Sequence, residues 1–332
     1  MTILVTGGAG YIGSHCVRQL IQSGKKVCVI DNLSRGHRAA VPAEASFFQL
    51  DLLETEPLTE IMKSQRIEKV IHFAALAYVG ESVADPLPYY TNNTAGTLSL
   101  LRAMRQARVS QLVFSSSCAT YGIPDQLPIT EDSPQRPINP YGWSKLFVEQ
   151  ILKDCASSYP NFGFIGLRYF NVVGCSKDGA VGEDHNPETH LIPNCLRTAL
   201  GQQSHITVLG NDYPTPDGTC IRDYIHVEDI CSAHLLALNA LTTQSSRFYN
   251  VGLGQGFSVQ EVISTSEKVT GCPIPVDIQT RRPGDPPMLS ASHERISSEL
   301  GWSPKYRSLE EIIQTAWDWF RTHPAGYRTD HP

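Results

Sequence analysis

The chain has 332 residues, a formal net charge of −6 at pH 7 and a sequence pI near 6.0. This length is sufficient for two lobes around a large core, and the acidic balance offers no basic stripe, so we expect no nucleic-acid partner. The nine cysteines form no CxxC pair and no His/Cys cluster at zinc spacing, which predicts reduced thiols, a cytoplasmic location and no metal site. No apolar run approaches about 20 residues, so no membrane partner is expected either.

The N-terminal residues predict a dinucleotide-binding unit. A β-branched run at residues 2–6 leads into the glycine-rich stretch 7–13, after which apolar residues recur at helical spacing. A second strand at residues 27–30 ends in Asp31. Glycines let a backbone approach a pyrophosphate, and the helix N-terminus presents free N–H groups to its charge. Asp31 favours NAD over NADP because it would bind the adenosine ribose and repel a 2′-phosphate, although two arginines within residues 35–38 leave NADP open.

The following segments alternate between strand-like and helix-like sequence. A long helix is predicted over residues 92–108, and the predicted strands are residues 47–50, 69–73, 111–114 and 162–168. This alternation predicts an α/β fold with a doubly wound parallel (Rossmann) sheet, which binds ligands at the carboxyl ends of its strands. His72 lies within an apolar strand, so we expect a packed core histidine.

The stretch from Asn139 to Lys145 places a phenol and an ammonium on one face of a predicted helix. Asn139 is a good N-cap, Pro140 suits the first helical position, and Tyr141 and Lys145 are four residues apart. A cation beside a phenol favours the phenolate, so the pair is suited to moving the proton of a substrate hydroxyl near neutral pH. The spacing alone fits a surface pair that meets no ligand equally well. The serines at 115–117 follow a predicted strand and therefore lie where ligands are expected.

The second half of the chain has longer loops, rich in Gly, Pro, Asn and Asp, which are typical of binding segments. Between these loops we predict a helix at 191–200, a strand at 206–209 and an amphipathic helix at 228–241 that returns to the first lobe. The predicted division is a dinucleotide-binding Rossmann domain at residues 1–172, with a returning segment at about 220–241, and a smaller mixed α/β substrate lobe at residues 173–332.

An ordered set of motifs runs along the whole chain. Besides the glycine stretch, Ser115 to Ser117 and Tyr141-x-x-x-Lys145, it includes residues 31–33, 79–82, 90–93, 167–171, 182–184, 210–215, 222–227 and 282–285. With this set the chain resembles the UDP-glucose 4-epimerases of the extended short-chain dehydrogenase/reductase superfamily. The set as a whole is far more specific than any single motif.

The resemblance implies an isomerase of galactose metabolism that interconverts UDP-glucose and UDP-galactose through a 4-keto sugar on tightly bound NAD. Its implied catalytic residues are Ser117, Tyr141 and Lys145. Tyr141 would take and return the O4 proton, Ser117 would hydrogen-bond O4, and Lys145 with the oxidised nicotinamide would lower the pKa of the phenol. A homodimer built from the helices beginning near Asn92 and near Tyr141 is also implied.

The resemblance further implies two sets of ligand contacts. The NAD contacts would be Gly7, Gly10, Tyr11, Ile12, Asp31, Asn32, Asp51, Leu52, Phe73, Ala74, Asn92, Ser115, Lys145 and Tyr169. The UDP-sugar contacts would be Ser117, Tyr141, Asn171, His190, Leu191, Thr207, Leu209, Arg222, Arg282, Asp285 and Leu289. Arginines suit a sugar nucleotide because a planar guanidinium binds pyrophosphate through paired, charge-assisted hydrogen bonds.

Three positions bear on specificity. Ala77 and His190 depart from the best-known bacterial pattern, which often carries a lysine and an asparagine there. Leu289 stands where some members carry a bulky tyrosine that restricts the 2-substituent of the sugar. We therefore hypothesise that UDP-N-acetylglucosamine and UDP-N-acetylgalactosamine are also substrates.

Rival functions remain at this point. A nucleotide-sugar 4,6-dehydratase needs an additional acid and base, usually a Thr-Asp-Glu sequence, where this chain has Ser117, Cys118 and Ala119. A UDP-pentose or UDP-uronate 4-epimerase is poorly separated by the sequence. A non-catalytic NAD-binding protein would keep the glycines and Asp31 but would have no need of the Ser, Tyr and Lys together.

Overall fold

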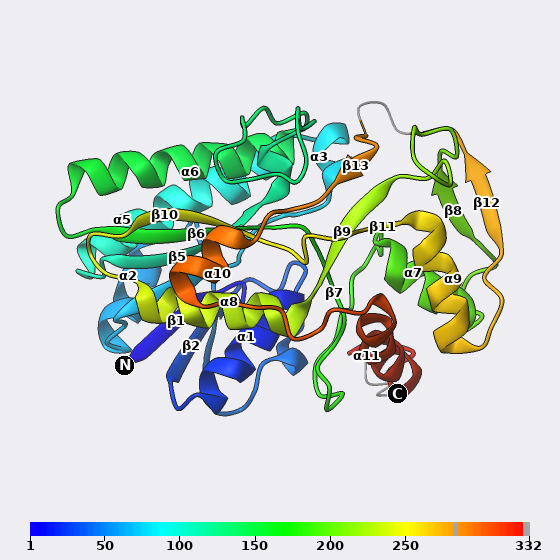
Figure 1. The fold of residues 1–332 in the computed structure, drawn as a ribbon. Helices are drawn as coiled ribbons and strands as arrows, with labels where there is room; N and C mark the ends of the chain where they lie inside the picture. The colour runs from blue at the N-terminus through cyan, green and yellow to red at the C-terminus, as the bar shows by residue number, and fades with distance from the viewer. Residues whose placement is uncertain (282–284, 328–332) are drawn as a thin grey trace.

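The computed structural model describes residues 1–281 and 285–327, and a parallel sheet of seven strands lies at its centre (Figure 1). The strand order is β10-β6-β5-β4-β1-β2-β3. The strands are β1 (Thr2–Thr6), β2 (Lys26–Asp31), β3 (Ser46–Gln49), β4 (Lys69–His72), β5 (Gln111–Ser117), β6 (Gly163–Tyr169) and β10 (Ser246–Val251). The order reverses between β1 and β4, which creates the crevice where doubly wound sheets bind ligands. The predicted Rossmann-type α/β fold is confirmed.

Helices cover both faces of this sheet (Figure 1). Helices α1 (Tyr11–Gln22) and α8 (Val227–Ala240) pack on one face, while α2 (Thr55–Ser64), α5 (Gly96–Gln106) and α6 (Pro140–Ser158) cover the other. The alternation of side chains along β1 explains the two layers, because Ile3 and Val5 enter one core and Leu4 enters the other. Trp302 and α10 (Glu294–Leu300) extend the α1–α8 layer.

A smaller lobe of mixed strands and helices lies at the carboxyl side of the large sheet (Figure 1). Its centre is β9 (Ile221–His226), which pairs in parallel with β7 (Asn171–Val173) and β13 (Met288–Leu289) and antiparallel with β11 (Gly256–Ser258). A separate parallel pair consists of β8 (Ile206–Leu209) and β12 (Val276–Gln279). Its helices are α7 (Leu191–Ala199), α9 (Val259–Thr270) and α11 (Leu309–Thr322).

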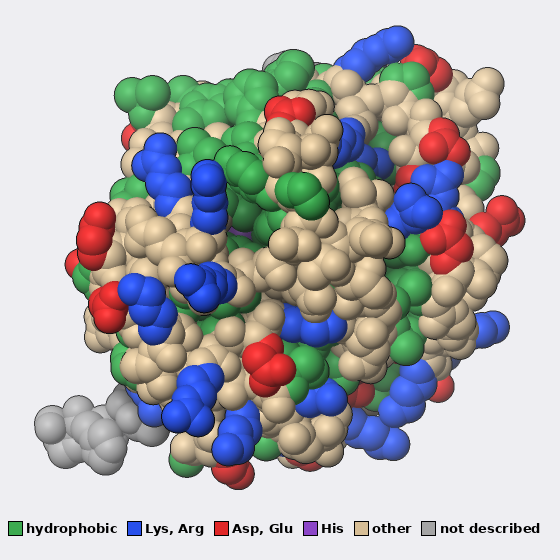
Figure 2. Space-filling view, turned by 90° about the vertical axis from the view of Figure 1, so that its left-hand side faces the viewer, with side chains coloured by type: hydrophobic (Ala, Val, Ile, Leu, Met, Phe, Trp, Pro, Cys, Tyr) green, Lys and Arg blue, Asp and Glu red, His purple; other side chains and the backbone are tan. Residues whose placement is uncertain are grey.

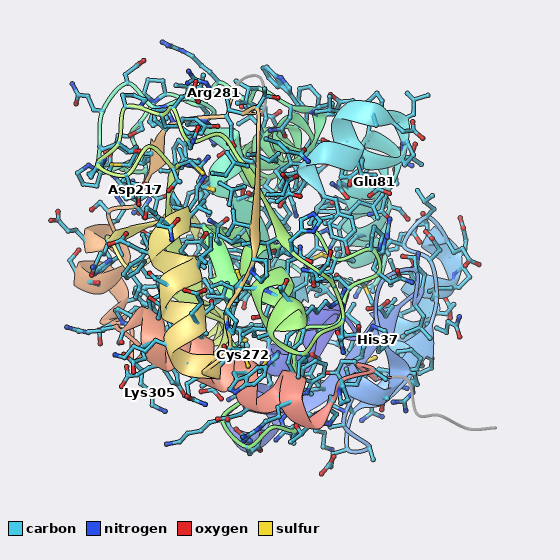
Figure 3. The ribbon with its side chains drawn as sticks, turned by 90° about the vertical axis from the view of Figure 1, so that its right-hand side faces the viewer. His37, Glu81, Asp217, Cys272, Arg281 and Lys305 are labelled. Atoms are coloured by element: carbon cyan, nitrogen blue, oxygen red, sulfur yellow. The ribbon has the colours of Figure 1, made fainter. Side chains whose placement is uncertain are left out.

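Figure 3 views this lobe from its outer side, with Arg281 at the end of β12 and Asp217 beside the start of α9. The start of α9 is fixed by a capping box in which Ser258 and Glu261 each bond the backbone N–H of the other. Asp217 also accepts a hydrogen bond from the Ser258 hydroxyl. The loop before β9 is therefore tied to the helix that follows β11.

Short helical turns complete the chain: η1 (Arg38–Ala40), α3 (Val79–Ala84), α4 (Leu87–Tyr89), η2 (Tyr90–Ala95) and η3 (Cys118–Thr120). The π-helical turn η2 interrupts the helix predicted over residues 92–108. Within it, Asn93 bonds both backbone groups of Leu76 and the hydroxyl of Ser144, so one side chain links three segments. Among the described residues, no helix combines the length and hydropathy needed to cross a bilayer.

His72 is buried within β4, as predicted. Its ring nitrogens lie 2.7 Å from the Thr6 hydroxyl and 2.9 Å from the Thr97 hydroxyl. Burial lowers the pKa of His72 to about 3, so this histidine is a neutral part of the core.

Candidate active site

The turn between β1 and α1 is shaped by glycines. Gly7 has a φ of 70° and its N–H donates to the Ile30 carbonyl at 2.8 Å. A Cβ on Gly13 would lie 2.1 Å from the Gly7 carbonyl oxygen, so only glycine fits there. Gly10 is the N-cap residue of α1 and provides no side-chain hydrogen bond. A Cβ on Gly10 would contact only the Gly7 carbonyl oxygen, at 3.4 Å. Open space therefore faces the N–H groups at the start of α1, a geometry that fits a dinucleotide pyrophosphate.

The acids expected at the adenosine end lie beside this turn. The Asp31 carboxylate accepts the backbone N–H groups of Ala9 at 3.0 Å and Leu33 at 2.8 Å, and burial raises its pKa. Asn32 donates to the Asp51 carboxylate at 2.9 Å. The ends of β2 and β3 thus hold an acid next to the glycine turn, as a ribose site requires. Tyr11 and Ile12 begin α1, and Leu52 is buried behind Asp51.

The ends of β4, β5 and β6 supply the next group of predicted cofactor contacts. Phe73 and Ala74 follow β4, and Ala74 lies directly against Gly7, because a Cβ on Gly7 would come within 2.5 Å of the Ala74 nitrogen. The hydroxyls of Ser115 and Tyr169 are hydrogen-bonded across β5 and β6. Asn92 lies in η2. These residues line the carboxyl edge of the sheet around its reversal point.

Tyr141 and Lys145 lie in the first two turns of α6. The side chain of Asn139 accepts the Gly142 N–H at 2.8 Å, which confirms the predicted N-cap, and Pro140 occupies the first turn. Lys145 is 3% exposed; its ammonium donates to the Ser115 carbonyl at 2.8 Å and lies 6.0 Å from the Tyr141 ring centroid. The structure therefore brings β5 and α6 together at the predicted catalytic residues.

Burial dominates the electrostatics of the pair in the chain without a ligand. Burial raises the pKa of Tyr141 to about 12, although a hydrogen bond with Ser117 opposes this shift. Burial also lowers the pKa of Lys145 to about 7, although Glu149 opposes that shift. Burial therefore outweighs the other influences on both groups in the chain without a ligand. The expected lowering of the phenol pKa involves an oxidised nicotinamide as well as Lys145, and it stays a prediction.

Three of the predicted substrate contacts meet in the smaller lobe. Arg222 on β9 forms an ion pair with Asp285 at 2.6 Å. Leu289 on β13 is in register with Arg222 and packs against the same hydrophobic cluster as Cys118, which follows Ser117. Arg282 lies outside the described residues. Leu289, whose side chain is expected to limit the size of the 2-substituent of the sugar, thus lies between the end of β5 and Arg222, the predicted phosphate-binding arginine.

The remaining predicted substrate contacts are more dispersed. Asn171 starts β7 and Leu191 starts α7, whereas Thr207 and Leu209 belong to the separate β8–β12 sheet. His190 caps α7, and its Nδ1 lies 2.8 Å from a carboxylate oxygen of Glu188 and 3.2 Å from one of Glu183. The histidine is therefore engaged by two carboxylates in the described chain.

A buried charge network behind the pair was not predicted. Glu149 lies one turn after Lys145 on α6; it accepts two hydrogen bonds from the Arg168 guanidinium, at 2.9 and 2.7 Å, and one from the Ser116 hydroxyl at 2.6 Å. Both charged side chains are at most 3% exposed. The only sequence signal was the i, i+4 spacing from Lys145, which does not reveal that the acid faces the core.

Comparisons with known proteins agree with this geometry. Residues 3–252 match the model of the NAD dependent epimerase/dehydratase family. The chain is 49% identical to the UDP-glucose 4-epimerase of Lactobacillus helveticus, and the match covers 98% of this chain and 99% of that protein.

Solved structures are also similar over nearly the whole chain. One is UDP-glucose 4-epimerase from Bifidobacterium longum in complex with NAD+ and UDP, with a TM-score of 0.94 and 39% identity over 98% of this chain and 100% of that one. Another is the UDP-Glc/GlcNAc 4-epimerase from Campylobacter jejuni, with a TM-score of 0.83 and 42% identity over 97% and 99% of the two chains.

Proposed function

The chain belongs to the NAD dependent epimerase/dehydratase family, and from this premise we propose that it is an NAD-dependent 4-epimerase that interconverts UDP-glucose and UDP-galactose. The observation that carries the proposal is the junction of β5 and α6. There the ammonium of Lys145, beside the ring of Tyr141, bonds the strand that ends in Ser117. This junction adjoins a turn that fits a dinucleotide.

The cofactor contacts in this proposal follow the carboxyl edge of the sheet. They are Gly7, Gly10, Tyr11, Ile12, Asp31, Asn32, Asp51, Leu52, Phe73, Ala74, Asn92, Ser115, Lys145 and Tyr169. NAD, when bound, supplies the hydride acceptor and donor for C4 of the sugar and a positively charged ring that favours the phenolate. The glycine turn and the N-terminus of α1 hold the pyrophosphate.

Tyr141 carries the proton in this scheme. Its phenolic oxygen takes the proton of the sugar O4 as C4 is oxidised and returns it when C4 is reduced from the opposite face. Ser117, at the end of β5, holds O4 in line. Lys145 anchors the helix to the Ser115 carbonyl, so the phenol and the serine keep a fixed relation while the proton moves.

The nucleotide is held by the smaller lobe. Its proposed contacts are Asn171, His190, Leu191, Thr207, Leu209, Arg222, Arg282, Asp285 and Leu289. Arg222 reaches the phosphates with its guanidinium, which Asp285 orients through their 2.6 Å ion pair. Inversion at C4 requires that the sugar turn over, so binding energy has to come mainly from UDP.

A single assay tests this function. The purified protein is mixed with UDP-galactose, and the products are followed by nuclear magnetic resonance and by absorbance. We expect UDP-glucose to form until both sugars reach equilibrium, with no NADH released into solution. Net NADH would indicate a dehydrogenase, a keto-deoxy sugar a dehydratase, and unchanged substrate a binding protein; each result would contradict the proposal.

The leucine at position 289 supports activity on the N-acetylated sugars as well. Leu289 is partly buried against the Cys118 cluster, so its short side chain borders the expected sugar position. The similar structure from Campylobacter jejuni is named as a UDP-Glc/GlcNAc 4-epimerase. Turnover of UDP-N-acetylglucosamine by the wild type, and its selective loss in Leu289→Tyr, are the expected results. A wild type that leaves the acetylated sugar unchanged would contradict this part.

The lobes, assembly and location form part of the same proposal. Residues 1–172, with the returning segment at about 220–241, bind NAD, and residues 173–332 bind the UDP-sugar. A homodimer forms through α5 and α6, where Trp143 and Phe147 are 39% and 43% exposed. The chain works in the cytoplasm, a location supported by the absence of any CxxC pair among its scattered cysteines.

A further inference from the structure

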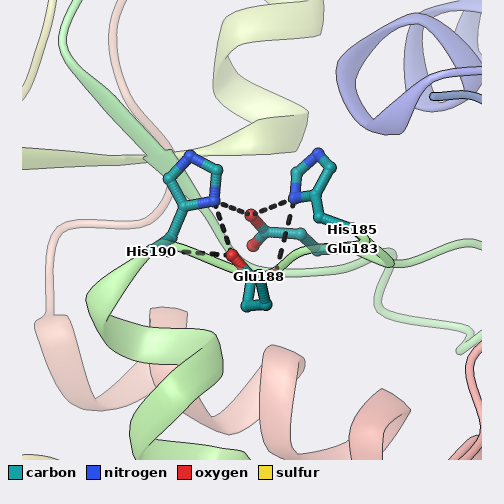
Figure 4. A group of neighbouring side chains, drawn as sticks. All are labelled: Glu183, His185, Glu188 and His190. Atoms are coloured by element: carbon teal, nitrogen blue, oxygen red, sulfur yellow. Dashed lines mark hydrogen bonds and ion pairs between the residues drawn. The ribbon is translucent and has the colours of Figure 1, made fainter. Parts of the chain in front are cut away.

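Four side chains between β7 and α7 point into one small space: Glu183, His185, Glu188 and His190 (Figure 4). One ligating atom from each residue lies within 4.8 Å of all the others. Together they offer two imidazole nitrogens and two carboxylate oxygens, a donor set suited to divalent metals such as zinc. The cluster lies in the loop before α7, outside the glycine turn and the β5–α6 junction, and it shares His190 with the proposed nucleotide contacts.

Three nitrogen–oxygen distances within the cluster are close to the edges of a tetrahedral metal site. Zinc binds His nitrogen and carboxylate oxygen at about 2.0–2.2 Å, so neighbouring ligand atoms are separated by about 3.3–3.6 Å. The His185 Nδ1 lies 3.3 Å from Glu183 and 3.5 Å from Glu188, and the His190 Nδ1 lies 3.2 Å from Glu183. These three separations are longer than most charge-assisted hydrogen bonds, which lie at about 2.7–2.9 Å. The His190 Nδ1 also lies 2.8 Å from Glu188, which is a hydrogen-bond distance.

Two of the atoms that face this space are buried without a hydrogen-bond partner. They are the Nδ1 of His185 and the Oε2 of Glu188. The other oxygen of Glu188 is already engaged by the backbone N–H groups of Thr189 and His190, each at 2.8 Å. Leaving a buried polar atom unpaired costs free energy, and a cation between the four side chains would satisfy both atoms at once.

The charges in the cluster balance for one divalent cation. The carboxylates of Glu183 and Glu188 are 4% and 1% exposed, so their two negative charges need a partner close by. Two protonated imidazoles or one divalent cation with neutral imidazoles would both neutralise them. The His185 Nδ1 lies 3.3 Å from Glu183 and 3.5 Å from Glu188, so the geometry fits either state and titration with zinc decides between them.

We propose that Glu183, His185, Glu188 and His190 bind one divalent transition-metal cation of the zinc class, which holds the β7–α7 loop against the larger lobe. The His185 ring lies 6.1 Å from the ring of Tyr11 on α1 and 5.9 Å from that of Tyr78, both edge to face. The cation has a structural role: it fixes the loop that leads into α7.

The test measures metal binding by the full-length protein after treatment with a chelator and removal of the chelator. Titration with Zn²⁺ alone, followed by calorimetry and elemental analysis, should give one tight site per chain. His185→Gln and Glu188→Gln should each weaken this site by roughly tenfold or more, since even outer-shell changes cost about 10–100-fold in metal affinity. The matched control His205→Gln, at an exposed histidine outside the cluster, should bind zinc as the wild type does.

A second measurement needs no variant. X-ray absorption at the zinc edge distinguishes nitrogen and oxygen ligands, at about 2.0–2.2 Å, from sulfur ligands at about 2.3 Å. Two imidazoles and no sulfur are expected. Absence of a tight site, unchanged zinc binding in His185→Gln, or sulfur in the coordination sphere would each overturn the proposal.

Discussion

Tyr141 is buried, and its hydroxyl is protonated at neutral pH in the protein without a ligand. Burial raises its pKa to about 12, and the nearby Lys145 has a pKa of about 7, so the protein alone does not create a phenolate at neutral pH. A phenol with such a raised pKa stays protonated at neutral pH. It becomes a base when positive charge is brought next to it, as a nicotinamide ring would do.

Removal of this hydroxyl should abolish most of the turnover. We expect Tyr141→Phe to lower the turnover of UDP-galactose by about 10²-fold or more, since a positioned acid–base group contributes roughly 10²–10⁴. The NAD content of the purified variant should equal that of the wild type, because the ring and the helix remain. Turnover close to that of the wild type, measured with the cofactor still bound, would refute the assignment of the base.

Glu149 gives a stability prediction at the same scale. Glu149→Gln should lower the free energy of unfolding by about 3 kcal/mol or more, because the buried Arg168 guanidinium would keep its charge without a partner. Urea unfolding measures the change. Glu310→Gln, which disrupts the exposed Lys268–Glu310 pair, is the control and should cost at most about 1 kcal/mol. Equal effects of the two substitutions would contradict a buried role for Glu149.

Sequence reasoning at the scale of residues depends on local signals. The N-cap at Asn139 and the core position of His72 followed from neighbours in the chain and are confirmed. The burial of the Tyr141 hydroxyl, which raises its pKa in the chain without a ligand, could not be predicted because it depends on how much water the folded chain excludes. The Glu149–Arg168 pair was missed for the same reason: its partners are separated along the chain and meet only through β6 and α6.

At the scale of elements, the glycine turn offers a paired test of cofactor binding. Gly10→Ala places a methyl group in the space that faces the start of α1, where Gly10 has a φ of −78° that alanine adopts without strain. We expect NAD retention to fall while the melting temperature stays near that of the wild type. Gly13→Ala should lower both, because its Cβ would lie 2.1 Å from the Gly7 oxygen. A Gly10→Ala protein that purifies with full NAD would contradict the proposed pyrophosphate site.

Some elements were easier to predict than others. The glycines, a β-branched strand and a periodic helix are adjacent in sequence, so β1 and α1 could be predicted together. The π-helical turn η2 could not, because it depends on bonds from Asn93 to segments distant in the sequence. The cluster of Glu183, His185, Glu188 and His190 could not be predicted from cysteine and histidine spacing, because its carboxylates alternate with its histidines.

At the scale of the whole molecule, the strand order of the sheet follows from how consecutive strands are connected. The formation of a dimer depends instead on which side chains are exposed on the surface. The alternation of strands and helices was enough to predict a doubly wound parallel sheet, and the structure places the reversal of its strand order between β1 and β4. Which face meets a second copy is not encoded in that alternation. Figure 2 shows hydrophobic side chains gathered toward the top of one face, and Figure 1 places α6 along the top of the molecule.

The exposed aromatic residues of α6 provide the last prediction. Phe147 is 43% exposed, and its ring lies 5.6 Å from that of Trp143 and 6.0 Å from that of Tyr90, so these rings form an apolar surface. Buried in a dimer, this surface would gain hydrophobic free energy that a lysine would remove. Phe147→Lys should therefore shift the protein from dimer to monomer in light scattering coupled to gel filtration. Val276→Lys, at a 41% exposed position on β12, should leave the dimer intact. A monomeric wild type, or an unchanged dimer in Phe147→Lys, would show that α6 does not form the interface.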